Sequence, residues 1–210
     1  MKKLPQTVQT YDRIAKIYEK KYGNLPESEV PYLQKFYNLT TSISKKPKIL
    51  DAGCGTGRDL AYLETLSAEL YGVDLSRGML SIAKNKLKKS HLLKADIRAL
   101  PFPDEFFDGI FSIATLVHLP SKGKEEAINE FWRVLKPNGI LYICVQNLLY
   151  FPRLLRCIKY RERNAVVYDG RYWYFPTKYF LELLLKRYNF DILYASSFCS
   201  KRLRFYGRKM

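Results

Sequence analysis

The segment KILDAGCGTGRDL, residues 48–60, decides the fold, because it joins a short apolar run to a loop with glycine at every second position. A run that ends in Asp51 and leads into Gly53, Gly55 and Gly57 predicts a buried strand, followed by a tight turn that a ligand approaches closely. In open α/β sheets the loop after the first strand is a usual ligand contact. The segment therefore predicts a nucleotide-like ligand at this turn.

From residue 48 onward, strand-like and helix-like stretches alternate, which predicts an α/β fold: a mostly parallel sheet with helices on both faces. The expected strands are residues 48–53, 68–75, 91–96, 106–114 and 139–146, followed by a hairpin-like pair at 190–198 and 201–209. The expected helices are residues 8–22, 30–43, 76–89, 122–136 and 176–188.

A chain of 210 residues is long enough for one well-buried core, so we expect a single domain. Residues 147–175 are too long for a connection and too aromatic for a disordered linker, and we interpret them as a lid insertion over the active face. The expected parts are an N-terminal helical cap (1–46), a cofactor-binding core (47–146), the lid (147–175) and a final helix with strands (176–210).

The net charge of +16 is concentrated in the flanks of the chain. Residues 49–149 are balanced, whereas residues 1–48 carry +6 and residues 150–210 carry +10. This pattern indicates a neutral core beside a surface that attracts an anionic partner, although lysine-rich solvated helices explain it equally well.

Composition also bounds the location and the redox chemistry of the chain. The longest apolar run, residues 139–145, is too short to span a membrane, and no apolar stretch of signal-peptide length begins the chain. We therefore expect a cytoplasmic protein. The four cysteines contain no C-x-x-C pair, so we expect free thiols and no metal site.

The spacing in the glycine loop separates the classes of nucleotide. A dinucleotide fingerprint needs a third glycine at position 58, which is Arg58, and a phosphate loop needs a Lys-Ser or Lys-Thr pair that is absent. Asp51 would repel a diphosphate but suits the amino group of an amino acid. Asp74, 17 residues after Gly57, suits the two hydroxyls of a ribose. S-adenosyl-L-methionine fits this combination.

Four motifs then occur in order: ILDAGCGTGRDL, YGVDLS, KADIRALPFPDEFFDGIFSIATLVHL and RVLKPNGILYICV. In order and spacing they resemble the motifs of class I S-adenosylmethionine-dependent methyltransferases, most closely the type 11 group. The likeness spans about residues 11 to 145. It implies methylation by a Rossmann-like transferase with a seven-stranded sheet in the order 3-2-1-4-5-7-6, strand 7 antiparallel, and S-adenosyl-L-homocysteine as product.

The resemblance also implies which residues hold the cofactor. Asp51 and the three glycines would line the methionine part, Asp74 would hold the ribose, and Asp96 would sit at the adenine. Family members often supply a tyrosine from an N-terminal helix, so Tyr11 or Tyr18 is a candidate, with core packing as the alternative. The full expected set is Tyr11, Tyr18, Asp51, Gly53, Cys54, Gly55, Gly57, Asp74, Leu75, Asp96, Ile97 and Ala114.

The catalytic group is less determined, because methyl transfer is an in-line displacement at an activated sulfonium and needs no strong base. For a hydroxyl acceptor, His118 just past the fourth strand is a candidate base; the alternative is a hydrogen-bonded structural histidine under the lid. The chain lacks the Asn/Asp-Pro-Pro-aromatic motif of amino methylation of DNA bases, the Pro-Cys nucleophile of pyrimidine methylation, and an acidic metal cluster.

Two acceptor classes remain open. One is a small, metabolite-like molecule that is methylated on oxygen or nitrogen under an aromatic lid formed by RYWYF, residues 171–175, with Tyr168. The expected lid residues are Tyr168, Arg171, Tyr172 and Trp173. RNA, in particular a modified wobble uridine of tRNA, is the alternative, because basic and aromatic residues interleave after residue 150. The likeness of YDRIAKIY and FSIATLVHL to tRNA wobble-uridine methyltransferases supports it weakly. A non-catalytic cofactor-binding subunit would show a damaged glycine loop or lack Asp74, and both are intact.

Overall fold

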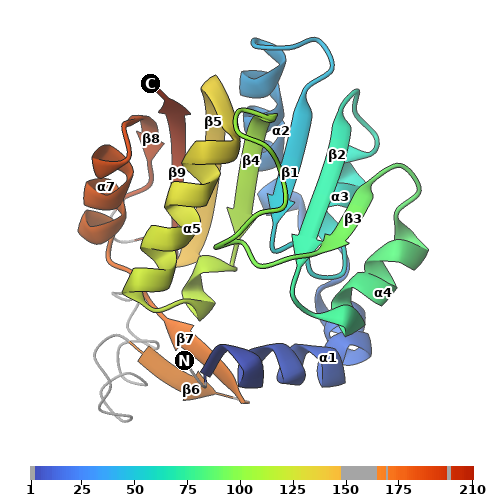
Figure 1. The fold of residues 1–210 in the computed structure, drawn as a ribbon. Helices are drawn as coiled ribbons and strands as arrows, with labels where there is room; N and C mark the ends of the chain where they lie inside the picture. Colours follow the sequence, from blue (N-terminus) through green and yellow to red (C-terminus); the bar gives the residue numbers. More distant parts are fainter. Residues whose placement is uncertain (1–2, 148–164, 169, 198–199) are drawn as a thin grey trace.

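A mixed sheet of seven strands forms the centre of the computed structural model, which describes residues 3–147, 165–168, 170–197 and 200–210. The strand order is β3-β2-β1-β4-β5-β9-β8 (Figure 1). The strands are β1 (Lys48–Ala52), β2 (Glu69–Asp74), β3 (His91–Lys94), β4 (Phe107–Ile113), β5 (Leu135–Gln146), β8 (Phe190–Ala195) and β9 (Arg202–Lys209).

Strands β1 to β5 pair in parallel, and β9 is antiparallel to both of its neighbours. Since β8 and β9 are the sixth and seventh strands of this sheet along the chain, the predicted order 3-2-1-4-5-7-6 with an antiparallel seventh strand is confirmed. Parallel strands end at the same edge, so the loops after β1, β2 and β4 gather there.

Helices cover both faces of the sheet (Figure 1). One core contains side chains of α5 and α7, and the other contains side chains of α2, α3 and α4. The helices are α1 (Lys3–Tyr22), α2 (Val30–Thr41), α3 (Arg58–Leu63), α4 (Arg77–Lys86), α5 (Ser121–Val134) and α7 (Lys178–Arg187), with short 3-10 turns η1 (Glu27–Glu29) and η2 (Leu116–His118).

The central strands are apolar on both sides because each side faces a core. In β4, Ile110 belongs to one core and the adjacent Phe111 to the other, and neither is exposed. Strands buried on both faces are expected to have continuous apolar sequences, as residues 139–145 of β5 have. Cys54 and Cys144 are buried free thiols, as predicted, while Cys157 and Cys199 lie outside the described residues.

Helix α1 and a hairpin formed by β6 (Ala165–Tyr168) and β7 (Arg171–Tyr174) lie at one end of the sheet (Figure 1). Tyr172 N–H donates to Thr7 Oγ1 at 3.0 Å, and Thr10 Oγ1–H donates to the Gly170 carbonyl at 3.1 Å. The first helix of the chain and a hairpin about 160 residues later therefore pack together, and they do so where the loops after β1, β2 and β4 gather.

Three features differ from the sequence-based expectation. Helix α1 begins at Lys3 rather than at residue 8, because Pro5 lies in the first turn, where a missing N–H costs no helical hydrogen bond. Helix α3 was not predicted, and residues 165–168 and 171–174 of the expected lid are strands. The rest of that lid, residues 148–164 and 169, lies outside the described residues. Within the described ranges, no helix has the length and apolar character needed to cross a bilayer.

Candidate functional site

The loop after β1 contains three glycines with positive φ angles, each for its own reason. A Cβ on Gly53 would lie 2.1 Å from Thr115 Oγ1, and one on Gly57 would lie 2.7 Å from Leu87 Cδ1. A Cβ on Gly55 would meet nothing within 4 Å. Gly53 and Gly57 are therefore small because the protein packs against them, whereas the bare backbone of Gly55 faces open space.

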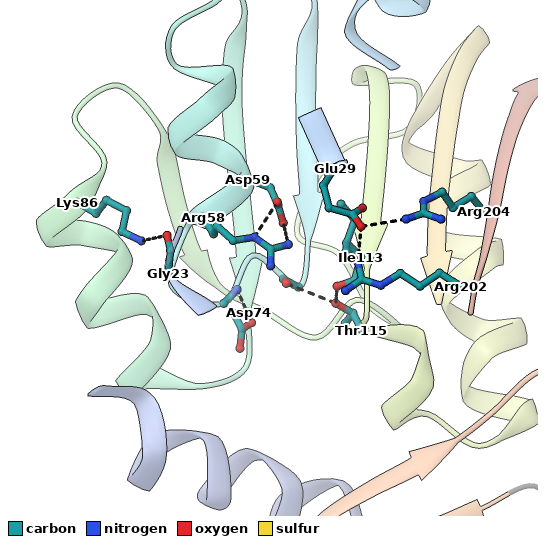
Figure 2. A network of polar contacts seen from close by, with 12 residues as sticks. Gly23, Glu29, Arg58, Asp59, Asp74, Lys86, Ile113, Thr115, Arg202 and Arg204 are labelled. Carbon is teal, nitrogen blue, oxygen red and sulfur yellow. Dashed lines mark hydrogen bonds and ion pairs between the residues drawn. The ribbon is translucent and has the colours of Figure 1, made fainter. Parts of the chain in front are cut away.

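Asp74, at the carboxyl end of β2, holds this loop in place (Figure 2). Its Oδ2 accepts from Gly55 N–H at 2.9 Å, and its Oδ1 accepts from Ser76 N–H at 2.8 Å. Burial raises the pKa of Asp74 above its ordinary value, although these backbone donors oppose the rise. Each carboxylate oxygen can accept a second hydrogen bond, so Asp74 can still bind hydroxyl groups of a ligand.

Asp51, at the end of β1, is buried with one oxygen unsatisfied. The residue is 2% exposed, and its Oδ2 has no hydrogen-bond partner among the described residues. Burial raises the pKa of Asp51 well above its ordinary value, and the nearby charge of Asp59 adds to this, while Arg58 opposes it. Buried carboxylate oxygens are rarely left without a donor, which points to a missing ligand group.

A side cavity of about 120 Å³ lies beside Asp74 and the start of α4. Asp96 lines it and is bound by Arg98, whose Nε lies 3.0 Å from Asp96 Oδ1. Most of the predicted cofactor residues line this cavity: Tyr11, Tyr18, Gly53, Gly55, Asp74, Leu75, Asp96, Ile97 and Ala114.

A main cavity of about 400 Å³ also borders the glycine loop and is lined by residues of β7 and β9. It combines aromatic rings with guanidinium groups. Its aromatic wall consists of Tyr11, Tyr18, Tyr22, Trp173 and Phe175. Its polar and charged residues are Thr56, Arg58, Asp59, Gln146, Arg171 and Arg202, and Gly53, Cys54, Gly55, Ile113 and Ala114 complete the lining.

His118 joins α1 to the hairpin through both of its ring nitrogens. Nδ1 lies 2.6 Å from the Tyr172 carbonyl oxygen, and Nε2 lies 2.8 Å from the Tyr11 hydroxyl. A carbonyl only accepts, so Nδ1 carries the proton and Nε2 accepts from the Tyr11 hydroxyl. Burial lowers the pKa of His118 to about 4, and therefore the ring is neutral at pH 7. Neither nitrogen is open to an incoming ligand.

Four of the predicted site residues are not among the described residues that line either cavity: Asp51, Gly57, Tyr168 and Tyr172. Asp51 is buried at the end of β1. Gly57 begins α3 and packs against Leu87, so it does not line the cavities as the resemblance implied. The Tyr172 ring is buried against Tyr174, with ring centroids 4.5 Å apart, because alternate residues of β7 point to opposite sides. The side chain of Tyr168 lies outside the described structure.

Phe175, the last residue of the RYWYF stretch expected in the lid, lines the main cavity on the same two-residue period as Arg171 and Trp173. Several other lining residues were not predicted from the sequence. Arg202 and Gln146 are opposite each other on β9 and β5, and no spacing in the sequence reveals this pairing. Among the described residues, no group of three or more His, Cys, Asp and Glu side chains is arranged to hold a metal ion.

The sequence is similar to known methyltransferases over its core. A family model described as "Methyltransferase domain" matches residues 50–143. Methyltransferase GfsG of Streptomyces halstedii is 33% identical over 48% of this chain and 38% of its own length. An uncharacterised protein of Methanocaldococcus jannaschii is 31% identical over 88% of this chain and 76% of its own length. The chain thus spans less than half of GfsG but most of the second relative.

A tRNA (carboxymethyluridine(34)-5-O)-methyltransferase of Arabidopsis thaliana is 34% identical over 57% of this chain and 34% of its own length. Among solved structures, a SAM-dependent methyltransferase of Methanosarcina mazei gives a TM-score of 0.73 at 20% identity, over 89% of this chain and 99% of its own. The 1,6-didemethyltoxoflavin-N1-methyltransferase of Burkholderia thailandensis, solved with bound 1,6-didemethyltoxoflavin and S-adenosylhomocysteine, gives a TM-score of 0.68 at 16% identity. The match covers 99% of this chain and 88% of that chain. At these identities the structural likeness shows a common fold.

Proposed function

Because the chain belongs to the class I S-adenosylmethionine-dependent methyltransferases of the type 11 group, we propose that it methylates an oxygen or nitrogen of a small, metabolite-like acceptor. S-adenosyl-L-methionine is its cofactor. One observation carries the proposal on the acceptor: the main cavity of about 400 Å³ adjoins the glycine loop and has aromatic walls. Aromatic walls of this kind suit a small organic group held beside the cofactor.

The residues at the site fit the cofactor. The unsatisfied oxygen of Asp51 would accept from its ammonium group, which would satisfy an otherwise orphaned buried acceptor. Gly55 would leave room for the methionine part, and Asp74 would accept from the ribose hydroxyls. Asp96 and Ile97, on the side cavity, would lie at the adenine.

The remaining task of the chain is to orient the acceptor and to exclude water. The cofactor supplies a methyl group on a positively charged sulfur, which leaves as a neutral thioether. We assign the orienting role to Tyr11 and Tyr18 from α1 and to Arg171 and Trp173 from β7, which meet beside the glycine loop. Holding the acceptor in line accounts for much of the rate enhancement in reactions of this kind.

We assign His118 a positioning role instead of the role of a base. Both ring nitrogens are engaged, and a pKa of about 4 makes the ring a weak proton acceptor at neutral pH. By holding Tyr11 and the backbone of Tyr172 at once, it would fix α1 and β7 relative to each other.

Two measurements test the proposed function. Titration calorimetry with S-adenosylmethionine and S-adenosylhomocysteine should give saturable 1:1 binding. Tritiated methyl label should then enter a low-molecular-weight cell extract in the presence of the protein. Absence of cofactor binding would contradict the proposal, and label found only in macromolecules would contradict the small acceptor.

A tRNA acceptor is the second candidate, favoured by the similarity to the Arabidopsis tRNA methyltransferase and by the charge of +10 over residues 150–210. Several of these basic and aromatic residues lie outside the described structure: Arg153, Arg156, Lys159, Tyr160, Arg161 and Arg163. Filter binding of bulk tRNA over a range of salt concentrations tests this candidate. Affinity that falls steeply with salt supports it, and no binding at low salt contradicts it.

A further inference from the structure

Two residues that line the main cavity each carry a buried polar atom without a hydrogen-bond partner among the described residues. The atoms are Nε1 of Trp173, a donor, and Oε1 of Gln146, an acceptor. Most buried polar atoms of proteins are hydrogen-bonded, and an unmet one costs free energy. The unmet oxygen of Asp51 is assigned to the ammonium group of the cofactor, so these two atoms need a separate explanation.

The indole ring of Trp173 is held by its neighbours, while its N–H remains unpaired. The ring centre lies 4.7 Å from that of His118 and 6.2 Å from that of Phe175, and the guanidinium carbon of Arg171 lies 5.3 Å from it. None of these contacts accepts a hydrogen bond from Nε1. Because an indole N–H only donates, the missing partner is an acceptor such as a carbonyl oxygen.

Gln146, the last residue of β5, lies opposite Arg202 in the pairing of β5 with β9. The guanidinium group of Arg202 binds Glu29, with its Nη1 3.1 Å from Glu29 Oε1 (Figure 2). It does not donate to Gln146 Oε1, although the two residues are neighbours. The missing partner of the Gln146 amide oxygen is therefore a donor such as an N–H group.

From this unmet donor and unmet acceptor, we propose that the acceptor molecule is a flat, lactam-like heterocycle. Its C=O accepts from Trp173 Nε1–H, and its N–H donates to Gln146 Oε1. This inference rests on the proposed methyltransferase function and names the chemical class of its acceptor. Side chains commonly change rotamer when a ligand binds, and such rotations would turn both buried atoms toward the ring. The aromatic wall of the cavity suits the faces of a flat molecule.

Trp132 provides a comparison within the same chain. Its Nε1 is also buried without a partner, but the residue lines neither cavity, and its ring lies 4.0 Å from Lys209 Nζ. An unpaired indole N–H is therefore not in itself a ligand site. Trp173 differs because it borders a cavity that also contains an unmet acceptor, and Trp132→Phe is the matched control for Trp173→Phe.

The first arm of the test measures binding by NMR titration in the presence of S-adenosylhomocysteine. The probes are 2-pyridone and 2-pyrone, two rings of the same shape in which N–H is replaced by a ring oxygen. The wild-type protein should bind 2-pyridone about tenfold more tightly, because 2-pyrone leaves Gln146 Oε1 unpaired. Equal binding of the two rings, or no binding of 2-pyridone, would overturn the proposal.

The second arm assigns each hydrogen bond to its residue. Gln146→Met should remove the preference for 2-pyridone, whereas Trp173→Phe should weaken both rings by about tenfold and keep the preference, since both rings carry the C=O. Trp132→Phe and Gln9→Met, which replaces an exposed glutamine of α1, should behave like the wild type. Affinity for S-adenosylhomocysteine reports on the fold of every variant. An undiminished preference in Gln146→Met would overturn the proposal.

The third arm identifies the source of the heterocycle. Tritiated methyl label is transferred in parallel to a low-molecular-weight extract and to bulk tRNA, with 2-pyridone or 2-pyrone as competitor. 2-Pyridone should suppress labelling more strongly than 2-pyrone, in the extract if the heterocycle is a free molecule and in the tRNA fraction if it is a nucleobase. Labelling that saturating 2-pyridone does not reduce would overturn this inference and leave the methyltransferase function intact. Failure to bind S-adenosylhomocysteine, or to label either fraction, would instead contradict the proposed function itself.

Discussion

The two halves of the proposed site, a cofactor side around the glycine loop and a lid side formed with β7 and β9, are built in different ways. The cofactor side comes from the ends of β1, β2 and β4, and backbone hydrogen bonds such as that from Gly55 N–H to Asp74 fix it. The lid side takes Tyr11 from α1, Trp173 from β7 and Arg202 from β9. Side-chain contacts of His118 with Tyr11 and Trp173 join α1 to β7. The first half depends on local backbone geometry, and the second depends on tertiary packing.

This difference shows where affinity and where specificity should reside. A substitution on the cofactor side should change cofactor binding first, because the loop geometry and the ligand contacts share the same atoms. A substitution on the lid side should change the use of the acceptor and leave the cofactor affinity nearly intact. The following four predictions test this division, from the largest expected effect to the smallest.

Asp74→Ala should weaken the binding of S-adenosylmethionine by about 100-fold, which corresponds to the loss of one to two hydrogen bonds to a charged group. The carboxylate holds both Gly55 N–H and Ser76 N–H, so its loss would also loosen the loop. Titration calorimetry measures the change, and Asp191→Ala, an exposed aspartate on β8, is the matched control. An affinity within threefold of wild type would remove Asp74 from the site.

Lowering the pH from 7 to 5 should destabilise the protein by about 2 kcal/mol through His118 alone. The pKa of this histidine is about 4 when folded and about 6.5 when unfolded, so the unfolded chain takes up the proton first as the pH falls. The stabilising contribution is thus complete above pH 6.5 and is lost as the pH falls toward 4.

Urea unfolding at pH 7 and pH 5, compared between the wild type and His118→Asn, isolates this effect. The variant should lose about 2 kcal/mol less stability than the wild type over this interval. His91→Asn replaces the other histidine of the chain, which is exposed, and should behave like the wild type. Equal pH dependence in all three proteins would mean that His118 does not hold the two sides together in its neutral form.

Trp173→Ala should lower kcat/KM by about tenfold, since one aromatic side chain in a closed pocket contributes one to two kcal/mol. The affinity for S-adenosylhomocysteine should stay within about twofold, because the residue lines the main cavity and not the side cavity. Tyr179→Ala, which removes an aromatic ring that is 68% exposed on α7, is the control. A comparable loss of cofactor affinity in Trp173→Ala would place this tryptophan on the cofactor side.

The variants Gly55→Ala and Gly57→Ala should separate two uses of the same residue type. Each places a Cβ at a positive φ, which costs about 1 kcal/mol. Gly57→Ala should lose more thermal stability than Gly55→Ala, because its Cβ meets Leu87. Relative to its loss of stability, Gly55→Ala should lose more cofactor affinity than Gly57→Ala. The reverse order in melting and calorimetry experiments would contradict the assignment of open space at Gly55.

The resemblance of the four motifs to class I methyltransferases predicted the strand order, and the strand assignments placed the proposed cofactor residues at one edge of the sheet. Asp51 and Asp74 lie at the ends of β1 and β2, and Gly55 lies in the loop after β1, so a strand assignment also places them at the sheet edge. Gly57 lines neither cavity, and its positive φ at the start of α3 explains the glycine without a ligand.

The lid side was predicted only in part, because its residues meet through packing. Arg171 and Trp173 were expected from their aromatic and basic surroundings, but nothing in the sequence relates them to Arg202 or Gln146. The engagement of His118 by Tyr11 and Tyr172, separated from it by 107 and 54 positions, also depends on tertiary structure.

The two-residue alternation in β7 has a consequence for how acceptor preference changes among related proteins. Arg171 and Trp173, with Phe175 just beyond the strand, line the main cavity, while the ring of Tyr172 packs against that of Tyr174 away from it. Insertion or deletion of one residue before Arg171 would reverse the two sides and replace the cationic wall by tyrosines. A single codon gained or lost in this hairpin could thus redirect the enzyme to another acceptor without any change in the core.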